Sequence, residues 1–365
     1  MLARMYLWGL SLLPHLGSVT IRKLVQAMGS EAEAFHATRE ELQAYTGIGH
    51  TRVDAIVRAR MELDLVSEWE KLYRHNNVKL ITWLDRDYPV RLQHIYDPPP
   101  VLYYRGDLSC LQHPTIAIVG RRRASPRGIG WSKRLGRDLA AAGVTVVSGL
   151  ALGIDTAAHE GSLETGRTAA VLGTGLDITY PKCNSKLARQ IERSGVLISP
   201  FPPATPPLRG NFPARNRIIS GLSMGVIVVE AGERSGALIT ATMAVEQNRD
   251  VYAIPGDPAN QGAAGPNKLI QAGAHLIRGA QDVLDEMQLS SQLQLPLIPS
   301  ESAKSHADFT GLAHELLECL GQPLDVDELV MITGLSVSEV NSTLLQLVLA
   351  GMVEELATGV FQRVS

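Results

Sequence analysis

The chain has 365 residues, of which 45% are hydrophobic and 19% are charged, and its formal net charge is −3. This composition is that of a globular protein of two or three domains. It excludes no nucleic-acid role, because a binding face depends on where charge lies. The three cysteines are far apart, which argues against a disulfide framework or a zinc site and favours a cytoplasmic location. No apolar run reaches membrane-spanning length, and Pro14 and His15 interrupt the apolar N-terminus, so we expect neither membrane insertion nor a signal peptide.

Residues 1–75 predict a helical domain with two helical hairpins, LPHLGSVTIRKLV from Leu13 and LQAYTGIGHTRVDAIV from Leu42. In the second hairpin, Gly47 and Gly49 permit the left-handed backbone that ends one helix and leave amides that open the next. Such amides can face a phosphate, as in helix-hairpin-helix (SAM-like) DNA-binding elements. A tight turn between two packed helices explains the same residues equally well.

Residues 76–112 are predicted as a connector, because Pro98, Pro99 and Pro100 preclude a helix there. From residue 113 to 288, apolar strands such as TIAIVG and GVIVVEA alternate with helices, which we expect near 129–142, 154–164, 185–193, 237–247, 268–272 and 281–287. The strands are continuous apolar runs, which is typical of a parallel sheet covered on both faces. The sequence therefore predicts an α/β protein with an extended Rossmann-like sheet.

Several strand ends carry Gly, Ser, Asn or cationic residues, and these ends should meet at one edge of the sheet. The first strand ends at GRRRAS, which lacks the GxGxxG fingerprint of dinucleotide sites. Arg121 and Arg122 in this loop could bind an anion, and Ser125 is a candidate helix cap or phosphate ligand. The second strand leads through Gly149 to Asp155, a candidate cap, and to His159, which is more typical of a structural than a catalytic residue.

The later strand ends extend the same pattern. The third ends at GTGLDITYPKCN, where Gly173, Lys182 and Asn184 suit a phosphate and Tyr180 is a candidate for base stacking or for simple packing. The stretch NFPARNRIISGLS adds cationic and amide side chains at a helix start, and AGERSGALITA adds another helix start. The candidate phosphate ligands in these last two stretches are Arg215, Asn216, Arg217, Ser235 and Gly236. Together, these strand ends predict a crevice that binds a polyanion, with Gly120 at its first turn.

Residues 289–307 have linker composition. Residues 308–365 predict three helices and a short hairpin, which is typical of a winged helix. The expected recognition helix, 336–350, contains no Lys or Arg and includes Glu339, so we interpret this domain as a protein-contact or regulatory module.

These motifs, in this order, resemble the DNA-processing protein A (DprA/Smf) family over nearly the whole chain. The most specific stretches are SGLALGIDTAAHEG, LGTGLDITYPKCN, NFPARNRIISGLS and SGALITA. The resemblance implies a non-enzymatic protein without cofactor that binds single-stranded DNA without sequence preference. It also implies protection of DNA strands during natural transformation, loading of the RecA recombinase and a homodimer formed through the Rossmann domain.

The resemblance also implies residue roles. Arg122 matches the phosphate-binding arginine of the family's Gly-Ser-Arg motif, Lys182 matches a DNA-contacting lysine, and residues 215–217 match the phosphate-pocket motif. Arg121 departs from the family, which has a small residue after the glycine, and this departure concerns the approach of a ligand to the backbone of that loop.

Two alternatives remain open at the level of sequence. A nucleotide phosphoribohydrolase has a similar Rossmann domain, but its Pro-Gly-Gly-x-Gly-Thr motif is absent from AGERSGALITA. A structural adaptor would use the winged helix as its working part.

Overall fold

The computed structural model describes residues 2–74, 78–293, 311–349, 352–357 and 360–363. The chain divides into two compact units, residues 1–294 and 295–365. Most of the linker predicted at 289–307 lies outside the described residues, although the helix α14 (Ala280–Leu293) runs into its start.

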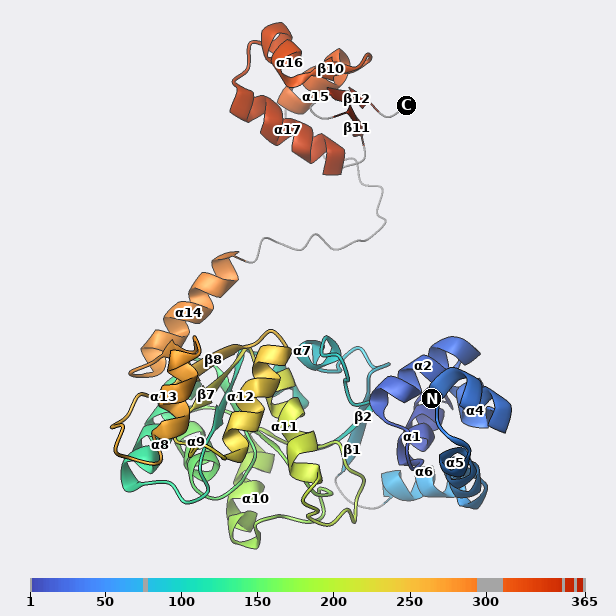
Figure 1. Cartoon of the computed structure of the whole chain (residues 1–365), viewed down its shortest axis with the longest axis vertical. Helices are drawn as coiled ribbons and strands as arrows, with labels where there is room; N and C mark the ends of the chain where they lie inside the picture. The colour runs from blue at the N-terminus through green and yellow to red at the C-terminus, as the bar shows by residue number, and fades with distance from the viewer. Residues whose placement is uncertain (1, 75–77, 294–310, 350–351, 358–359, 364–365) are drawn as a thin grey trace. The chain divides into compact units, whose positions relative to one another are not determined.

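Unit 1 is built on a nine-stranded sheet with the order β1-β2-β6-β5-β4-β3-β7-β8-β9 (Figure 1). The strands from β6 to β9 in this order are parallel, whereas β2 pairs antiparallel with β6 and β1 pairs antiparallel with β2. The strand bounds are β1 Lys79–Thr82, β2 Val101–Gly106, β3 Thr115–Val119, β4 Thr145–Ser148, β5 Thr168–Val171, β6 Val196–Ser199, β7 Gly225–Val228, β8 Asp250–Ala253 and β9 His275–Leu276. The predicted connector thus contributes two strands to the sheet, since its apolar runs on either side of the prolines pair with each other.

Alternate side chains of each strand enter two different apolar cores. Ile116 and Ile118 of β3 pack with helices α8, α9 and α14, whereas Ala117 and Val119 pack with α7, α11 and α12. The helix bounds are α7 Val90–Gln93, α8 Pro126–Ala141, α9 Ile154–Thr165, α10 Ser185–Ser194, α11 Asn211–Leu222, α12 Gly236–Glu246 and α13 Ala264–Gln271, with short 3-10 helices at Leu108–Gln112 and Lys182–Asn184. The predicted sheet covered on both faces is therefore confirmed.

Two predicted helix starts lie too late in the chain. The helix α8 begins at Pro126 after the cap residue Ser125, and α13 begins at Ala264. Proline is favourable in the first turn of a helix because its missing N–H would have no partner there.

The N-terminal helices are α1 Leu2–Leu12, α2 Ser18–Met28, α3 Glu31–His36, α4 Arg39–Thr46, α5 His50–Glu62 and α6 Leu65–Arg74. Gly47 ends α4 in the left-handed conformation, at φ 67°, and Gly49 precedes α5, as the predicted hairpin requires. These helices share a core with the sheet edge, where the Trp8 indole donates a hydrogen bond of 2.7 Å to the Tyr103 hydroxyl. The predicted helical domain therefore packs as part of unit 1.

Unit 2 contains helices α15 Gly311–Cys319, α16 Val326–Thr333 and α17 Val337–Leu349 and the strands β10 Leu324–Asp325, β11 Val353–Ala357 and β12 Val360–Arg363. The order β10-β12-β11 and the three helices confirm the predicted winged helix. Across both units, none of the helices in the described ranges is both long and apolar enough to cross a membrane.

Candidate nucleic-acid interface

A cavity of about 510 Å³ lies where the direction of strand connection reverses, between β3 and β7. The loop after β3 leads to α8 on one face of the sheet, and the loop after β7 leads to α12 on the other face. Such switch points are where open parallel sheets bind ligands. The predicted site residues that line this cavity are Gly120, Arg121, Arg122, Arg215, Asn216, Ser235 and Gly236.

The rim of the cavity combines a cation with two aromatic rings. The guanidinium of Arg122 lies 5.4 Å from the ring centroid of Phe212, and that ring lies 5.7 Å from the ring of Tyr180. Tyr180 and Gly149 line a smaller adjoining cavity together with Arg122. Within the described parts of the chain, Arg121, Arg122 and Arg123 form no ion pair, so their charge is available to a ligand.

The floor of the cavity is a buried polar cluster. Arg215 is only 4% exposed, and its Nη1 donates a hydrogen bond of 2.8 Å to the carbonyl of Val171. A Cβ atom at Gly149 would lie 1.6 Å from that Nη1, so the close approach of the guanidinium requires glycine. The Asp155 carboxylate accepts hydrogen bonds from the backbone N–H groups of Gly149 and Ala151, so it braces the loop before α9, whose N-cap residue is Gly153 and not Asp155.

Burial and mutual attraction act in opposite directions on this cluster. Burial raises the pKa of Asp155, and the nearby Arg215 cation opposes that rise. Burial lowers the pKa of Arg215 to about 10, while Asp155 acts to raise it, so Arg215 remains a cation at neutral pH. Its Nε atom is buried and has no hydrogen-bond partner among the described residues. The charge of Arg215 is therefore compensated by Asp155 beneath the cavity, whereas Arg122 presents positive charge at the surface.

His159 is buried below the same floor. Its Nδ1 lies 2.7 Å from the Thr168 hydroxyl, and burial, with a smaller effect of Arg215, lowers its pKa to about 3. It lines neither of the two cavities at the site. This environment fits the structural interpretation of a neutral histidine and gives no path to a substrate.

The structure uses Ser125 differently from a phosphate ligand. Its hydroxyl caps α8 by accepting a hydrogen bond of 3.0 Å from the Gly128 N–H, and its own N–H and hydroxyl both donate to the Glu230 carboxylate. Glu230 comes from the end of β7 and is 8% exposed. Its carboxylate occupies the helix N-terminus that binds the pyrophosphate in a dinucleotide fold. Ser125 is therefore a helix cap and a hydrogen-bond partner of Glu230. The Glu230 carboxylate occupies the place at the N-terminus of α8 where the pyrophosphate of a dinucleotide would bind.

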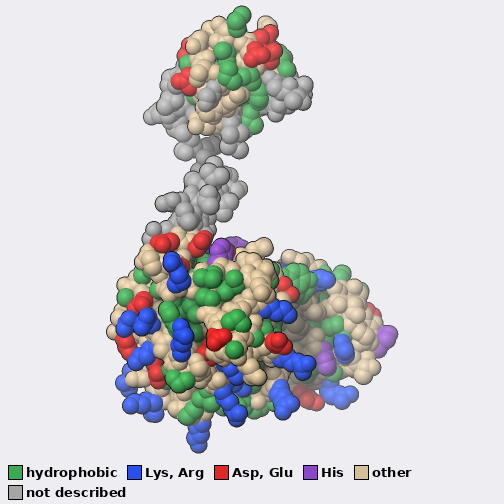
Figure 2. Space-filling model, turned by 60° about the vertical axis from the view of Figure 1, so that its left-hand side comes forward, with side chains coloured by type: hydrophobic (Ala, Val, Ile, Leu, Met, Phe, Trp, Pro, Cys, Tyr) green, Lys and Arg blue, Asp and Glu red, His purple; other side chains and the backbone are tan. Residues whose placement is uncertain are grey.

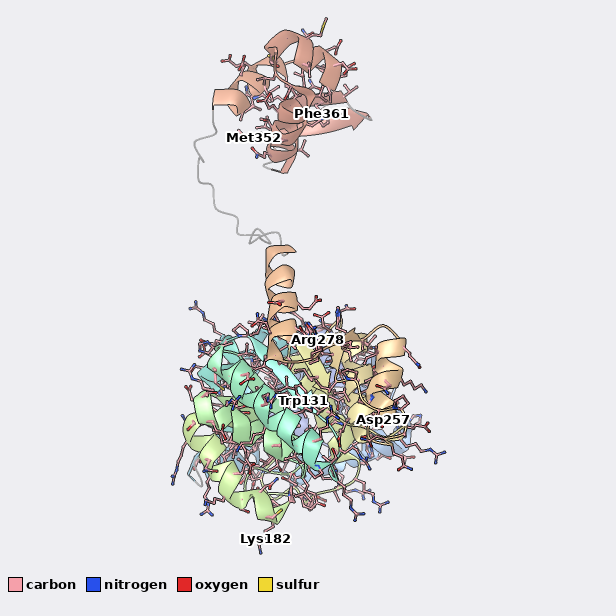
Figure 3. The ribbon with its side chains drawn as sticks, turned by 90° about the vertical axis from the view of Figure 1, so that its left-hand side faces the viewer. Trp131, Lys182, Asp257, Arg278, Met352 and Phe361 are labelled. Carbon is pink, nitrogen blue, oxygen red and sulfur yellow. The ribbon has the colours of Figure 1, made fainter. Side chains whose placement is uncertain are left out.

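Three predicted ligands after the third strand do not line the cavity. Asn184 is 7% exposed and donates hydrogen bonds of 2.9 Å to the Leu150 carbonyl and the Thr156 hydroxyl, so it braces the second strand-end loop. Gly173 lies against the ring of Phe212, which a Cβ atom would approach to 3.0 Å. Lys182 is exposed and points away from the sheet (Figure 3).

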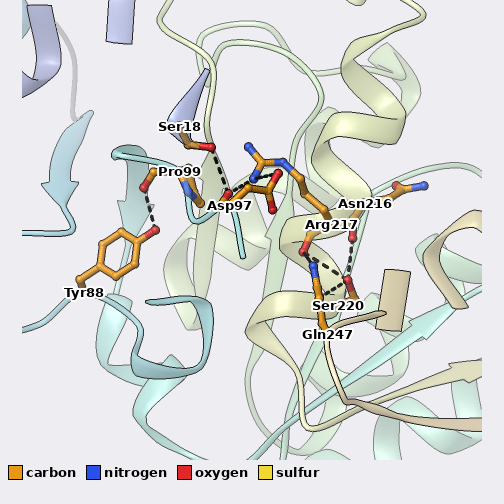
Figure 4. Close-up of polar contacts among 8 residues, drawn as sticks. All are labelled: Ser18, Tyr88, Asp97, Pro99, Asn216, Arg217, Ser220 and Gln247. Atoms are coloured by element: carbon orange, nitrogen blue, oxygen red, sulfur yellow. Dashed lines mark hydrogen bonds and ion pairs between the residues drawn. The ribbon is translucent and has the colours of Figure 1, made fainter. Parts of the chain in front are cut away.

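Arg217 does not line the cavity and forms an ion pair of its own. Its guanidinium binds the Asp97 carboxylate at 2.9 Å and also the Asp97 carbonyl, which in turn accepts a hydrogen bond from Ser18 (Figure 4). The Arg217 carbonyl accepts a hydrogen bond of 3.0 Å from Gln247 at the end of α12. Arg217 therefore ties α11 to Asp97 and to α12, and its role as a phosphate ligand stays a prediction.

Sequence reasoning missed Phe212, Arg234 and Glu230 as members of the site. Phe212 and Arg234 line the cavity and lie in the stretches NFPARNRIISGLS and AGERSGALITA. The available signals were an aromatic residue at a helix start and an arginine just before the next helix. For Glu230, the available signal was an acidic residue at the end of a buried strand. Such a residue can occupy the N-terminus of a neighbouring helix, as Glu230 does at α8. No group of three or more His, Cys, Asp or Glu residues within the described ranges could hold a metal ion.

The chain is similar to known proteins over most of its length. Residues 79–288 match the family model "DNA recombination-mediator protein A", and residues 300–359 match the "DprA winged helix domain". The chain is 36% identical to Protein Smf of Synechocystis over 93% of both chains. It is 47% identical to DNA processing protein DprA of Streptococcus pneumoniae over 56% of this chain and 73% of that protein.

Two solved structures are also similar. The X-ray structure of DprA from Streptococcus pneumoniae has a TM-score of 0.70 at 36% identity and covers 77% of this chain and 97% of that chain. The structure of DprA from Helicobacter pylori, which addresses its single-stranded DNA binding mode, has a TM-score of 0.54 at 30% identity. It covers 59% of this chain and 98% of that chain. The chain therefore belongs to the DNA recombination-mediator protein A family, which includes the DprA and Smf proteins.

Proposed function

We propose that this protein binds single-stranded DNA without sequence specificity in the crevice at the β3–β7 switch point. The observation that carries the proposal is the rim, where Arg122, which has no ion-pair partner among the described residues, lies over the ring of Phe212, and that ring contacts Tyr180. Cations for phosphates and aromatic faces for bases are the two components of sequence-tolerant single-strand binding. The Helicobacter pylori relative, whose structure addresses single-stranded DNA binding, supports the same ligand.

The division of charge between rim and floor gives the binding mode. Phosphates would contact Arg121, Arg122 and the backbone amide of Gly236, while the buried pair of Arg215 and Asp155 holds the floor of the cavity from below. Bases would stack on Phe212 and Tyr180, because every base has an apolar face whatever its sequence. Affinity should fall with salt, because each phosphate contact releases counterions.

Beyond binding, the proposal includes a mediator role in the cytoplasm. The protein would protect single strands, load RecA onto them during natural transformation and recombination, and act as a homodimer through the Rossmann domain without catalysing a reaction. The names of the family and of the DprA relatives support DNA processing and recombination. The buried, neutral His159 supports a binding rather than a catalytic site.

The winged helix is proposed to contact protein rather than DNA. Its helix α17 contains no Lys or Arg, although this is the helix that reads DNA in winged-helix proteins. Three apolar side chains are exposed here, Met331 and Ile332 in the last turn of α16 and Val337 at the start of α17. Acidic and apolar side chains lie on the face of unit 2 seen in Figure 2.

The test is the binding of fluorescent oligo-dT to the purified full chain and to the Arg122→Ala variant. We expect the variant to lose at least about tenfold in affinity, since a charge-assisted phosphate contact of about 1.5 kcal/mol or more is removed. Arg189→Ala is the matched control, because Arg189 is exposed on α10 and does not line the cavity. If folded Arg122→Ala binds as tightly as the control, the crevice is not the DNA site.

A further inference from the structure

The outer edge of α8 carries basic and aromatic residues that the crevice does not use. Arg127, Trp131 and Arg134 follow each other at spacings of four and three, which places them on one edge of the helix. The guanidinium of Arg134 lies 5.3 Å from the centroid of the Trp131 ring, which is half-buried and packs on the core beneath α8. Figure 3 looks onto this helix, with Trp131 labelled.

The two arginines along this edge differ from the other cations of α8 in their ion pairing. Lys133 pairs with Glu164 at 2.7 Å, and Arg137 pairs with Asp138 at 2.9 Å. Within the chain that the structure describes, neither Arg127 nor Arg134 forms an ion pair. Two of the four cations are therefore compensated, and the two that flank Trp131 are not.

This edge begins four residues after a residue that lines the crevice. Arg123 lines the cavity, and Arg127 follows it by four residues at the exposed start of α8. From Arg127 to Arg134 the helix advances about 10 Å. Beside Trp131, Gly130 leaves open space where a side chain would stand. A strand that leaves the crevice past Arg123 would meet a cation, an aromatic ring and a second cation in turn.

We propose that the edge formed by Arg127, Trp131 and Arg134 is a second contact for single-stranded DNA, which extends the path of the strand beyond the crevice. The proposal rests on the proposed function, because it needs a strand already held in the crevice. The alternating cation and aromatic ring match the components that track a single strand, and the charge is opposite to that of the phosphates. The crevice would bind a short strand alone, and the α8 edge would contribute only to longer strands.

The experiment compares oligo-dT of about 4 and about 16 nucleotides, the two ends of the range of site sizes in single-strand binding folds. In the full chain, Arg127→Ala/Arg134→Ala should weaken binding of the longer strand about tenfold and leave the shorter strand unchanged. The slope of log K against log salt should fall by about 1.4 for the longer strand, since each phosphate contact contributes about 0.7. Trp131→Leu should weaken the longer strand alone while keeping an apolar side chain on the core.

The matched control is Lys133→Ala/Arg137→Ala, which removes the same charge from the same helix. We expect this control to bind both strands as the wild type does. Equal loss in the control and the test variant would overturn the proposal in favour of a general charge effect, and so would no loss for the longer strand. If the wild-type protein bound neither strand, the proposed function itself would fail, which is a separate outcome.

Discussion

The rim and the floor of the crevice both contain arginine, but the protein uses the two arginines for different purposes. Arg122 at the rim is exposed, stacks on Phe212 and has no ion-pair partner among the described residues, whereas Arg215 at the floor is 4% exposed and donates to the Val171 carbonyl. The comparison shows that an arginine in a binding motif can stabilise the fold or can be free to contact a ligand. Burial and existing partners distinguish the two, and the sequence motif does not.

The largest expected effect is on stability and comes from the floor. Arg215→Met would leave the buried Asp155 carboxylate without its counter-charge, which should lower the free energy of unfolding by about 3–5 kcal/mol. Urea denaturation measures this quantity. Arg122→Met is the control at the rim, where we expect a change within about 0.5 kcal/mol. Equal stabilities for the two variants would remove the distinction between floor and rim.

The next effect is on binding and comes from the rim. Phe212→Leu keeps an apolar side chain at the start of α11 but removes the ring between Arg122 and Tyr180. We expect oligo-dT affinity to fall by about 1–3 kcal/mol, the contribution of one stacked base, with little change in stability. Tyr96→Leu is the control, because Tyr96 is an exposed aromatic residue that lines neither cavity. Unchanged affinity in Phe212→Leu would mean that bases do not stack at the rim.

A smaller effect tests the assignment of Arg217. If Arg217 positions α11, Asp97→Asn should weaken oligo-dT binding by about twofold, the effect of a partly exposed ion pair, without changing the salt slope. If Arg217 is instead a phosphate ligand, loss of the Asp97 charge frees it, and binding becomes tighter. The sign of the change in Kd therefore decides between the two roles.

The last effect appears only at acid pH and concerns His159. Its pKa is about 3 in the folded protein, against 6.5 for an ordinary histidine, so the unfolded chain binds more protons between these values. This contribution to stability is present above pH 6.5 and is lost as the pH falls toward 3. In His159→Asn, the free energy of unfolding should decline less steeply across this window, by up to about 1.4 kcal/mol per pH unit. Parallel curves for the two proteins would show that His159 does not titrate as its burial implies.

The sequence predicted the features that depend on local pattern. Continuous apolar strands gave the parallel sheet, and glycine and arginine at strand ends gave the position of the crevice, because the carboxyl ends of parallel strands meet at one edge. The family resemblance is also confirmed. The DNA contacts of individual residues stay predictions.

The features that sequence could not give depend on partners distant in the chain. Asn184, Ser125 and Arg217 each have a side chain suited to a phosphate. Their actual partners include Leu150, Glu230 and Asp97, which lie 34 to 120 positions away. The two strands formed by the predicted connector were missed for a related reason, since one of them pairs with β6 almost a hundred residues later.

The central claim is that the rim holds a single strand by phosphate charge and base stacking. The most direct measurement is the affinity of the full chain for single- and double-stranded oligonucleotides of the same sequence across a salt series. The account predicts tighter binding of the single strand, because stacked bases in a duplex cannot reach Phe212 and Tyr180. It also predicts a negative salt slope of about 0.7 per phosphate contact. Equal or tighter binding of the duplex, or binding that does not change with salt, would contradict it.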